Sequence, residues 1–308
     1  MTTGRCVQLL ALAALAVAAT AAPAQARPLD RRGLVATFRD EFTTLNVADP
    51  RDRQTWRGRN WKTWYSNGLD PFMRDNRTLP NNGESQAYID ATWPERAPGA
   101  FPPSSLSVRD GVLRISAEPA PATLRPLVHD LPYTSGMIAS WGMFSQRYGV
   151  FEARLRLPRG RGLWPAFWTL NDSGGWPPEI DIMEFLGHDP RTTWAVTHSR
   201  RAGKHVSRSR EINHGRDMTT DFHTFAVDWR PATVTYYVDN EMVLQTPTPR
   251  DMHRPMYIIL NLAVGGRWGG KPDAATQFPA HYEVDWVRVW QRPSNTARPK
   301  AKKKAVKR

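Results

Sequence analysis

The chain contains 308 residues, of which 40% are hydrophobic and 23% are charged, and it has 13 Trp. This composition is sufficient for a packed core and excludes wholesale disorder. The length allows one large domain or two ordinary ones. Outside the N-terminus the sequence has no apolar run of about 18 residues, which excludes a protein with several membrane spans. The many Trp residues favour flat apolar surfaces that meet a ligand, although core packing also uses Trp.

The N-terminal residues follow the pattern of a secretory signal. Arg5 supplies the positive start, residues 9–22 form a short apolar stretch, and the Ala24–Ala26 tripeptide is an A-x-A cleavage pattern. We therefore predict a signal peptide over residues 1–26 and a secreted protein, either extracellular or periplasmic. The single cysteine, Cys6, lies inside this signal, so the mature chain has no disulfide and depends on its core or on a bound metal.

The basic charge is concentrated at the C-terminus. Of the formal net charge of +13, Arg5 contributes one and the Lys and Arg residues of 292–308 contribute eight, which leaves +4 for residues 27–291. We expect residues 292–308 to be a disordered tail, because Pro, Ala and Lys offer little to bury. Such a tail is either a solvated end or a contact to an anionic polymer or the cell envelope. Export argues against a nucleic-acid partner, and we expect a monomer whose catalytic domain spans residues 27–291.

The body of the chain is patterned as short strands. Residues 150–157 alternate between apolar and charged side chains, which predicts a half-buried strand. Residues 107–116 form two β-rich arms around Asp110-Gly111, a dipeptide typical of tight hairpin turns. In the last strand we expect regular alternation, with Val284 on the face opposite Val287. Further strands are predicted at 225–229, 233–238 and 256–264.

No convincing helical period of ten or more residues accompanies these strands. Many short strands separated by Pro and Gly clusters predict an all-β sandwich or barrel of antiparallel sheets. Two irregular stretches, Trp61–Pro80 and Glu118–Pro132, interrupt the pattern. Because long ordered loops in a compact domain are usually functional, we expect both to rim a cleft.

The strongest chemical signal is a row of acids. Glu179 and Asp181 alternate with isoleucines, so in a strand both carboxylates point one way and the isoleucines enter the core. Simple alternation would bury Glu184. A β-bulge at Ile182–Met183 returns Glu184 to the acidic face, and bulges are common beside active sites. We therefore predict three carboxylates on one face.

Three crowded carboxylates suit the cleavage of glycosidic bonds. Repulsion raises at least one pKa, so that a protonated carboxyl stands beside an ionised one. A retaining hydrolase needs its two carboxyls about 5–5.5 Å apart and an inverting one needs about 6.5–9.5 Å. Two alternatives remain at this point. Ca²⁺ binds three acids but prefers loops with mixed oxygen donors, and a solvated strand face is disfavoured by the preceding Trp176, Pro177 and Pro178.

The acids resemble the E-x-D-x-x-E signature of glycoside hydrolase family 16. The resemblance covers roughly residues 34–291 and implies a concanavalin A-like β-jelly-roll sandwich of two curved antiparallel sheets, with a concave substrate groove. Similar blocks follow in the family's order at Phe38–Phe42, Asn81–Tyr88, Gly162–Trp168, Asp221–Trp229, Asn261–Gly266 and Val284–Val289.

The resemblance also implies roles for individual acids. By position Glu179 is the nucleophile and Glu184 is the general acid/base, with Asp181 between them. No cofactor is required for this catalysis. The family often carries a structural Ca²⁺ on its convex face, and Glu41 and Asp285 are the side chains that would bind it here.

Substrate contacts are implied in the same way. Trp164 and Trp168 would line the groove, where a flat ring covers the apolar face of a sugar, although core packing is the alternative for both. Asn82 and His198 would contact sugar hydroxyls, and a structural role for His198 stays open. Met137 stands where many family members carry Arg, which removes one usual polar contact.

Three further segments resemble bacterial endoglycanases that cleave exopolysaccharides, namely Tyr133–Ile138, Trp176–Glu179 and Glu184–Pro190. β-1,3 and β-1,3-1,4 glucans stay as competing substrates. The sequence thus predicts a secreted, retaining endo-β-glycanase that hydrolyses internal bonds of a polysaccharide by double displacement. A transglycosylase with the same residues and a non-catalytic carbohydrate-binding protein of the same fold are the alternatives.

Overall fold

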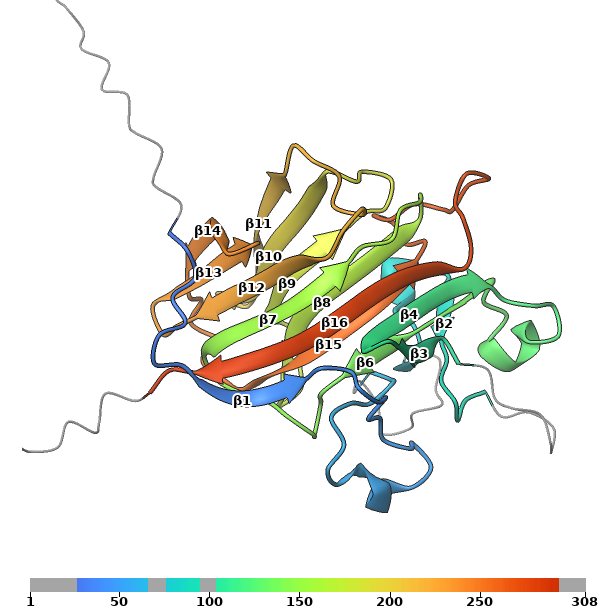
Figure 1. Ribbon diagram of the computed structural model, residues 1–308, viewed down its shortest axis with the longest axis horizontal. Coiled ribbons are helices and arrows are strands. Elements are labelled where there is room, and N and C mark those ends of the chain that lie inside the picture. Colours follow the sequence, from blue (N-terminus) through green and yellow to red (C-terminus); the bar gives the residue numbers. More distant parts are fainter. Residues whose placement is uncertain (1–26, 66–75, 95–103, 294–308) are drawn as a thin grey trace, which may run out of the picture.

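A computed structural model describes residues 27–65, 76–94 and 104–293 (Figure 1). The signal peptide predicted at 1–26 and residues 294–308 of the predicted tail lie outside this part of the chain. Within the described residues, no helix has the length and apolar character that crossing a membrane requires.

Two β-sheets face each other (Figure 1). All strand pairs are antiparallel except β2 with β5. The first sheet has ten strands, in the order β14 (Glu241–Pro247), β13 (Thr233–Val238), β12 (His223–Trp229), β7 (Gly149–Arg156), β16 (Ala280–Gln291), β4 (Val112–Pro119), β5 (Tyr133–Ser135) and β2 (Gln86–Tyr88), while β1 (Val35–Asp40) pairs with β16 and β3 (Leu106–Arg109) pairs with β4. The second sheet has six strands, in the order β11 (Lys204–Asn213), β10 (Thr192–Arg201), β9 (Glu179–Phe185), β8 (Leu163–Asn171), β15 (Met256–Val264) and β6 (Met137–Ala139). Short 3-10 helices lie at Arg53–Trp56, Pro80–Asn82 and Arg125–Val128.

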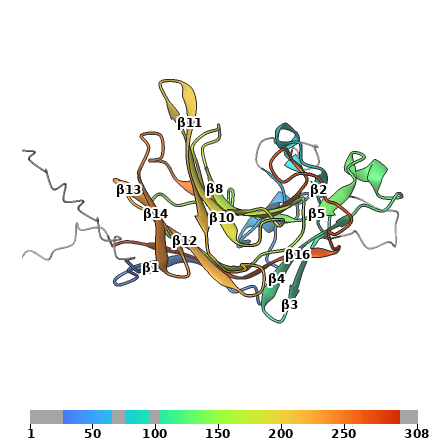
Figure 2. The same ribbon diagram turned by 90° about the horizontal axis from the view of Figure 1, so that it is seen from above.

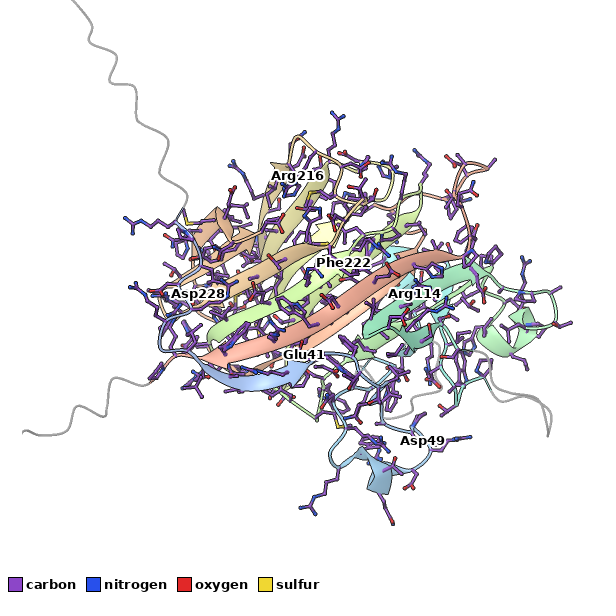
Figure 3. All side chains as sticks on the ribbon, viewed as in Figure 1. Glu41, Asp49, Arg114, Arg216, Phe222 and Asp228 are labelled. Atoms are coloured by element: carbon purple, nitrogen blue, oxygen red, sulfur yellow. The ribbon has the colours of Figure 1, made fainter. Side chains whose placement is uncertain are left out.

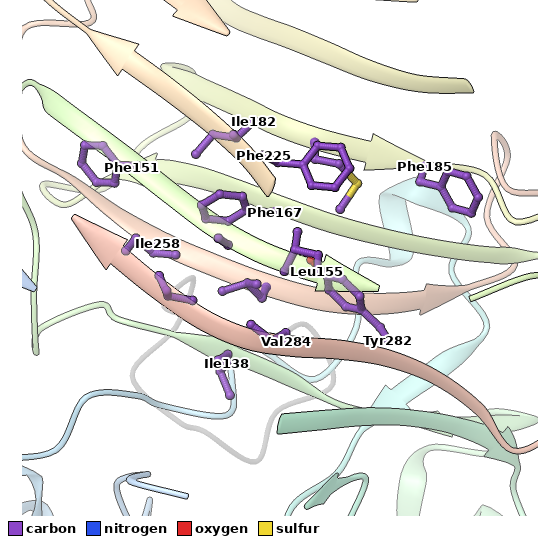
Figure 4. Close-up of a cluster of buried hydrophobic side chains, with 14 of the residues drawn as sticks. Ile138, Phe151, Leu155, Phe167, Ile182, Phe185, Phe225, Ile258, Tyr282 and Val284 are labelled. Atoms are coloured by element: carbon purple, nitrogen blue, oxygen red, sulfur yellow. The ribbon is translucent and has the colours of Figure 1, made fainter. Parts of the chain in front are cut away.

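The core fills the space between the sheets (Figure 4). Phe151 and Leu155 of β7 enter it from the ten-stranded sheet, and Phe167 of β8 enters it from the other. The alternation predicted for residues 150–157 is thus confirmed. Glu152, on the outer face, is nevertheless buried, because Arg31 of the N-terminal segment covers it with an ion pair.

The predicted turn at Asp110-Gly111 is confirmed, and a second turn has the same form. Asp110 and Gly111 join β3 to β4 with φ angles of 52° and 75°, and Asp239 and Asn240 join β13 to β14 with φ angles of 48° and 70°. Positive φ at both central residues matches the right-handed twist of the flanking strands, which is why Asp, Asn and Gly occupy these positions.

The last strand differs from its prediction. Val284 pairs with Leu155 and Trp286 pairs with Arg154, so Asp285 is an extra residue in β16. This bulge reverses the alternation, and Val284 lies in the core on the same face as Val287. The prediction that these two valines face opposite ways is therefore wrong.

The stretch Glu118–Pro132 also differs from its prediction. Its apolar side chains Leu124, Val128 and Leu131 pack with Trp93 and others in a small separate core. None of the loop's residues lines the groove described below. In contrast, the described part of Trp61–Pro80 does reach the groove, through Tyr65, Leu79 and Pro80.

Arg114 and Phe222 lie on the outer face of the ten-stranded sheet (Figure 3). Arg114 donates from Nε to Glu283 at 2.7 Å, and Arg156 shares the same carboxylate. Arg154 and Arg156 both lie over the ring of Phe222. Arg114, Arg154 and Arg156 thus each have an acidic or aromatic partner.

Arg292 belongs to the folded body. It donates from Nη2 to Asp228 Oδ2 at 2.7 Å and to the carbonyl of Asp30. The folded part therefore extends past Gln291, where we predicted the domain to end, by at least this one anchored side chain.

Candidate active site

A groove of about 1050 Å³ lies on the face of the six-stranded sheet that points away from the core. Strands β10 and β11 form one edge of this sheet (Figure 2), and residues of both line the groove. Strands β8, β9, β10, β11 and β15 contribute to it, and so do the segments around residues 79–84 and 268. Its aromatic side chains are Tyr65, Trp164, Trp168, Trp176, Trp194, Tyr257 and Trp268, and its carboxylates are Glu84, Glu179, Asp181 and Glu184.

The predicted bulge is present in β9. Phe167 pairs with Met183 and Trp168 pairs with Asp181, so Ile182 has no partner on β8. On the other side, Ile182 and Met183 together oppose the single residue between Trp194 and Val196. Both bulged side chains enter the core, and Figure 4 shows Ile182 there.

This irregularity brings Glu179, Asp181 and Glu184 into one groove, as the sequence predicted. We call them the carboxylate trio. The strand holds them without loop flexibility, because the residues between them are fixed in the packed core.

Glu179 is oriented by groups from two other segments. The indole Nε1 of Trp176 donates to Oε2 at 2.7 Å. The other oxygen, Oε1, lies 3.9 Å from Nε2 of His198. The two oxygens of Glu179 therefore have different surroundings, one held by an indole and one facing an imidazole.

Asp181 is the most buried of the three, with 3% of its surface exposed. Its Oδ2 lies 3.2 Å from Nε2 of His198 but has no hydrogen-bond partner of good geometry. The far nitrogen of that ring, Nδ1, lies 2.9 Å from Nε2 of His205, and the two imidazoles stack at 5.1 Å. His198 thus connects the buried aspartate to the groove rim.

Burial and mutual repulsion raise the pKa of every member of the trio. For Glu179, burial acts first and the charge of Asp181 second, while His198 and Trp176 oppose the rise. For Asp181, burial raises the pKa well above its usual range, and the charge of Glu184 adds to it. Burial, followed by the charge of Glu179, raises the pKa of Glu184 to about 8, against a weaker hydrogen bond from Trp164. Glu184 therefore retains its proton at neutral pH.

The predicted sugar-binding residues line the same groove. Trp164 donates from Nε1 to Glu184 Oε1 at 3.2 Å. Trp168 is 8% exposed and donates to Asn261 at 2.7 Å, so it both lines the groove and packs as part of its floor. Asn82 also lines the groove, and its side-chain amide donates to Glu84 at 3.0 Å.

Several lining residues were not predicted. Trp194 lies on the groove face of β10, four residues before His198, and stacks edge-on with Trp268 at 4.9 Å. The period of two along β10 would have identified Trp194 from His198. Trp268 follows β15 in a Gly-rich turn, and no periodic signal marks it. Trp176, which we expected to avoid solvent, is 49% exposed.

The two candidate calcium ligands are engaged elsewhere. Arg288 donates to both oxygens of Glu41, at 2.9 and 2.8 Å, close to β1 (Figure 3). Asp285 accepts from Arg154 at 2.5 Å. Because each carboxylate is already paired with a guanidinium, this arrangement does not fit a Ca²⁺ site built on these two side chains.

A β-sandwich whose outer face holds aromatic walls around buried, proton-retaining carboxylates has the site of a carbohydrate-cleaving protein. The family model described as Glycosyl hydrolases family 16 matches residues 102–288. The chain belongs to this family.

Known proteins show the same relationship. The endo-1,3-1,4-beta-glycanase EglC of Rhizobium meliloti is 36% identical over 262 residues, which are 85% of this chain and 53% of that protein. The chain thus spans about half the length of this curated relative. The endo-beta-1,3-glucanase of Pyrococcus furiosus superposes with a TM-score of 0.67 at 33% identity, over 85% of this chain and 95% of that one. The laminarinase catalytic domain of Thermotoga maritima superposes with a TM-score of 0.65 at 30% identity, over 85% of this chain and 99% of that one. The predicted jelly-roll sandwich is confirmed.

The bulge offers a test of how the trio is placed. Deletion of Met183 restores regular alternation and keeps all three carboxylates on the groove face, at the cost of one buried side chain. We expect a folded protein that is destabilised by about 2–5 kcal/mol and still cleaves polysaccharide.

The contrasting variant has an alanine inserted between Ile180 and Asp181. This insertion separates Glu179 from Asp181 and should lower activity by more than about a hundredfold. Thermal melts and reducing-end assays measure both. Equal inactivity of two folded variants would contradict this account.

The raised pKa of Glu184 predicts a stability profile. The folded protein holds this proton up to a pH of about 8, whereas a carboxyl with the ordinary pKa of 4.5 loses it earlier in the unfolded chain. Folding therefore binds a proton between these values, and stability falls as the pH rises through them. The variant Glu184→Gln cannot bind this proton, so its stability does not fall with pH for this reason.

Melting temperatures measured from pH 4 to 9 test the point. The melting temperature of Glu184→Gln should rise relative to that of the wild type as the pH increases. The variant Glu241→Gln, at an exposed residue, should melt like the wild type at every pH. Parallel profiles for Glu184→Gln and the wild type would show that Glu184 carries no such proton.

Proposed function

We propose that this chain is a secreted, retaining endo-β-glycanase that hydrolyses internal β-glycosidic bonds of a polysaccharide by double displacement. The observation that carries the proposal is the carboxylate trio, in which Glu184 has a pKa raised to about 8 beside a second glutamate on the same groove floor. The signal-like pattern of residues 1–26 supports export.

Glu184 suits the role of general acid. With its pKa near 8 it is protonated at neutral pH, and the groove gives it access to a leaving-group oxygen. Once the leaving group departs, the ionised Glu184 accepts a proton from the attacking water. Trp164, which donates to Glu184, stabilises the ionised form that this second step requires.

Glu179 suits the role of nucleophile. Trp176 and His198 both favour its ionised form, which no comparable pair of groups does for Glu184. The attack forms a bond from a carboxylate oxygen to the anomeric carbon as the bond to the leaving oxygen breaks. Asp181 lies between the two glutamates, and burial together with the charge of Glu184 raises its pKa, which favours its neutral form beside Glu179.

The groove favours internal cleavage. Trp176 contacts Glu179 at one end of the trio, and Trp164, which packs against Trp268, contacts Glu184 at the other end, so sugar units can bind on both sides of the trio. Indole rings offer flat apolar area to the C–H faces of sugars, and the amides and hydroxyls between them offer hydrogen bonds.

The substrate class follows from the relatives and from one substitution. The relatives are named as glycanases of 1,3 and mixed 1,3-1,4 linkages, so we propose a β-1,3 or β-1,3-1,4-linked chain, either a glucan or a bacterial exopolysaccharide. Met137, at the position where Arg was expected, is fully buried beside Trp168 and Tyr88. Met137 does not line the groove, so this position gives a sugar no direct polar contact.

The catalytic assignment is tested by Glu179→Gln, which keeps the shape of the side chain and removes its charge. We expect turnover to fall to well under about a tenth of the wild-type value, with polysaccharide binding retained. Glu241→Gln, on the exposed surface, is the matched control. Polarimetry or NMR of the first product should show the β-anomer. An initially inverted product, or retained turnover in Glu179→Gln, would refute the double displacement.

The C-terminal tail is tested by truncation. Removal of residues 294–308 takes away seven of the eight tail cations and leaves Arg292 on Asp228. We expect unchanged turnover of short neutral oligosaccharides and weaker binding to an anionic polysaccharide, with the difference shrinking as salt is added. Equal binding by the two forms at low salt would remove the proposed role of the tail.

A further inference from the structure

We propose that Glu179, Asp181 and His198 form a binding site for a transition-metal dication such as Zn²⁺, and that metal bound there blocks the groove. The metal site itself depends only on the geometry. Its inhibitory effect rests on the function proposed above.

The ligand atoms have the spacing of a tetrahedral zinc site. Bonds of about 2.0–2.1 Å to nitrogen and oxygen put neighbouring ligand atoms ~3.3 Å apart in a tetrahedron. His198 Nε2 lies 3.2 Å from Asp181 Oδ2 and 3.9 Å from Glu179 Oε1. All three ligand atoms lie within 4.8 Å of one another. Small side-chain movements are therefore enough to place one ion between them.

Neighbouring groups already orient these atoms. Trp176 occupies Oε2 of Glu179 with a 2.7 Å hydrogen bond, which turns Oε1 toward His198. His205 contacts Nδ1 of His198 at 2.9 Å, and this leaves Nε2 directed at the acids. Partners on the far side of metal ligands fix the orientation of those ligands and strengthen metal binding.

The site also contains an unsatisfied acceptor. Oδ2 of Asp181 is buried and has no hydrogen-bond partner, and the residue is 3% exposed. A buried acceptor without a partner is costly, and crowded carboxylates repel one another. A dication at this position would satisfy the oxygen and offset the repulsion together.

The donor set selects the kind of metal. Imidazole nitrogen with two carboxylate oxygens suits Zn²⁺, Ni²⁺ or Cu²⁺, whereas Ca²⁺ and Mg²⁺ prefer oxygen alone. Among the described residues, no other group of three His, Cys, Asp or Glu side chains has ligand atoms this close. The fourth coordination position faces the groove, so water can complete the shell.

Metal and substrate exclude each other at this site. When the metal binds Oε1 of Glu179, this oxygen can no longer attack an anomeric carbon. Bound polysaccharide in turn covers the route by which the ion enters. Metal inhibition should therefore be competitive with substrate and reversed by a chelator.

Calorimetric titration of the full secreted chain with Zn²⁺ tests the site without an activity assay. We expect one ion bound per chain and at least about tenfold weaker binding by His198→Asn. His188→Asn, at an exposed histidine outside the groove lining, is the matched control and should bind like the wild type. Ca²⁺ should give no heat that depends on His198. Co²⁺ in place of Zn²⁺ should give the intense visible absorption of tetrahedral coordination in the wild type and in His188→Asn but not in His198→Asn.

Unchanged Zn²⁺ binding by His198→Asn would overturn the proposal. A thermal melt checks that this variant is folded, and Glu179→Gln provides a second ligand variant that should also bind Zn²⁺ more weakly. Zn²⁺ binding that depends on His198 in a protein without glycanase activity would support the site and refute the proposed function. Competitive, chelator-reversible inhibition of an active wild type, together with weaker Zn²⁺ binding by His198→Asn, supports both.

Discussion

The active groove depends on the crowding of three carboxyl groups along one strand. Strand β9 can hold them together only because its two bulged residues, Ile182 and Met183, both enter the core and restore Glu184 to the groove face. Close packing around these anchors keeps the acids from relaxing apart. Because the acids cannot move apart, burial and their mutual repulsion raise their pKa values, and Glu184 keeps a proton at neutral pH. A general acid needs such a proton.

Much of this could be predicted from the sequence, because the pattern had only one physically acceptable arrangement. Burying Glu184 unpaired would be costly, and one extra residue avoids it. The bulge in β16 was missed although the same reasoning applies there. Regular alternation would put Asp285 on the face of Val287 and Val289, or Arg288 on the face of Val284, so either face would carry a charge into the core. The extra residue at Asp285 lets Val284, Val287 and Val289 enter the core together. Strand irregularities are thus predictable where a charge would otherwise be buried.

The protonation of the trio depends on residues from elsewhere in the fold. Trp164 comes from β8, His198 from β10, and Trp176 from the segment before β9. The sequence predicted that at least one pKa must rise, but the separation of roles depends on which glutamate receives which partner. Glu179 receives an indole and an imidazole, and Glu184 receives an indole alone. Such pairings join strands far apart in sequence, so no local pattern contains them.

The arrangement around Glu179 has a consequence for selectivity among small cations. In the proposed mechanism Oε1 of Glu179 attacks an anomeric carbon, so it must have no strong hydrogen-bond partner before the substrate binds. The neighbouring Oδ2 of Asp181 also has no hydrogen-bond partner. A proton, a sugar carbon and a dication are alternative partners for this same pocket of negative potential. Because His198 adds a nitrogen ligand to two oxygens, the pocket discriminates against the abundant hard cations Ca²⁺ and Mg²⁺ and is left open to the scarcer transition metals. The features that suit Glu179 to the proposed role of nucleophile are therefore the same ones that would expose it to metals with affinity for imidazole.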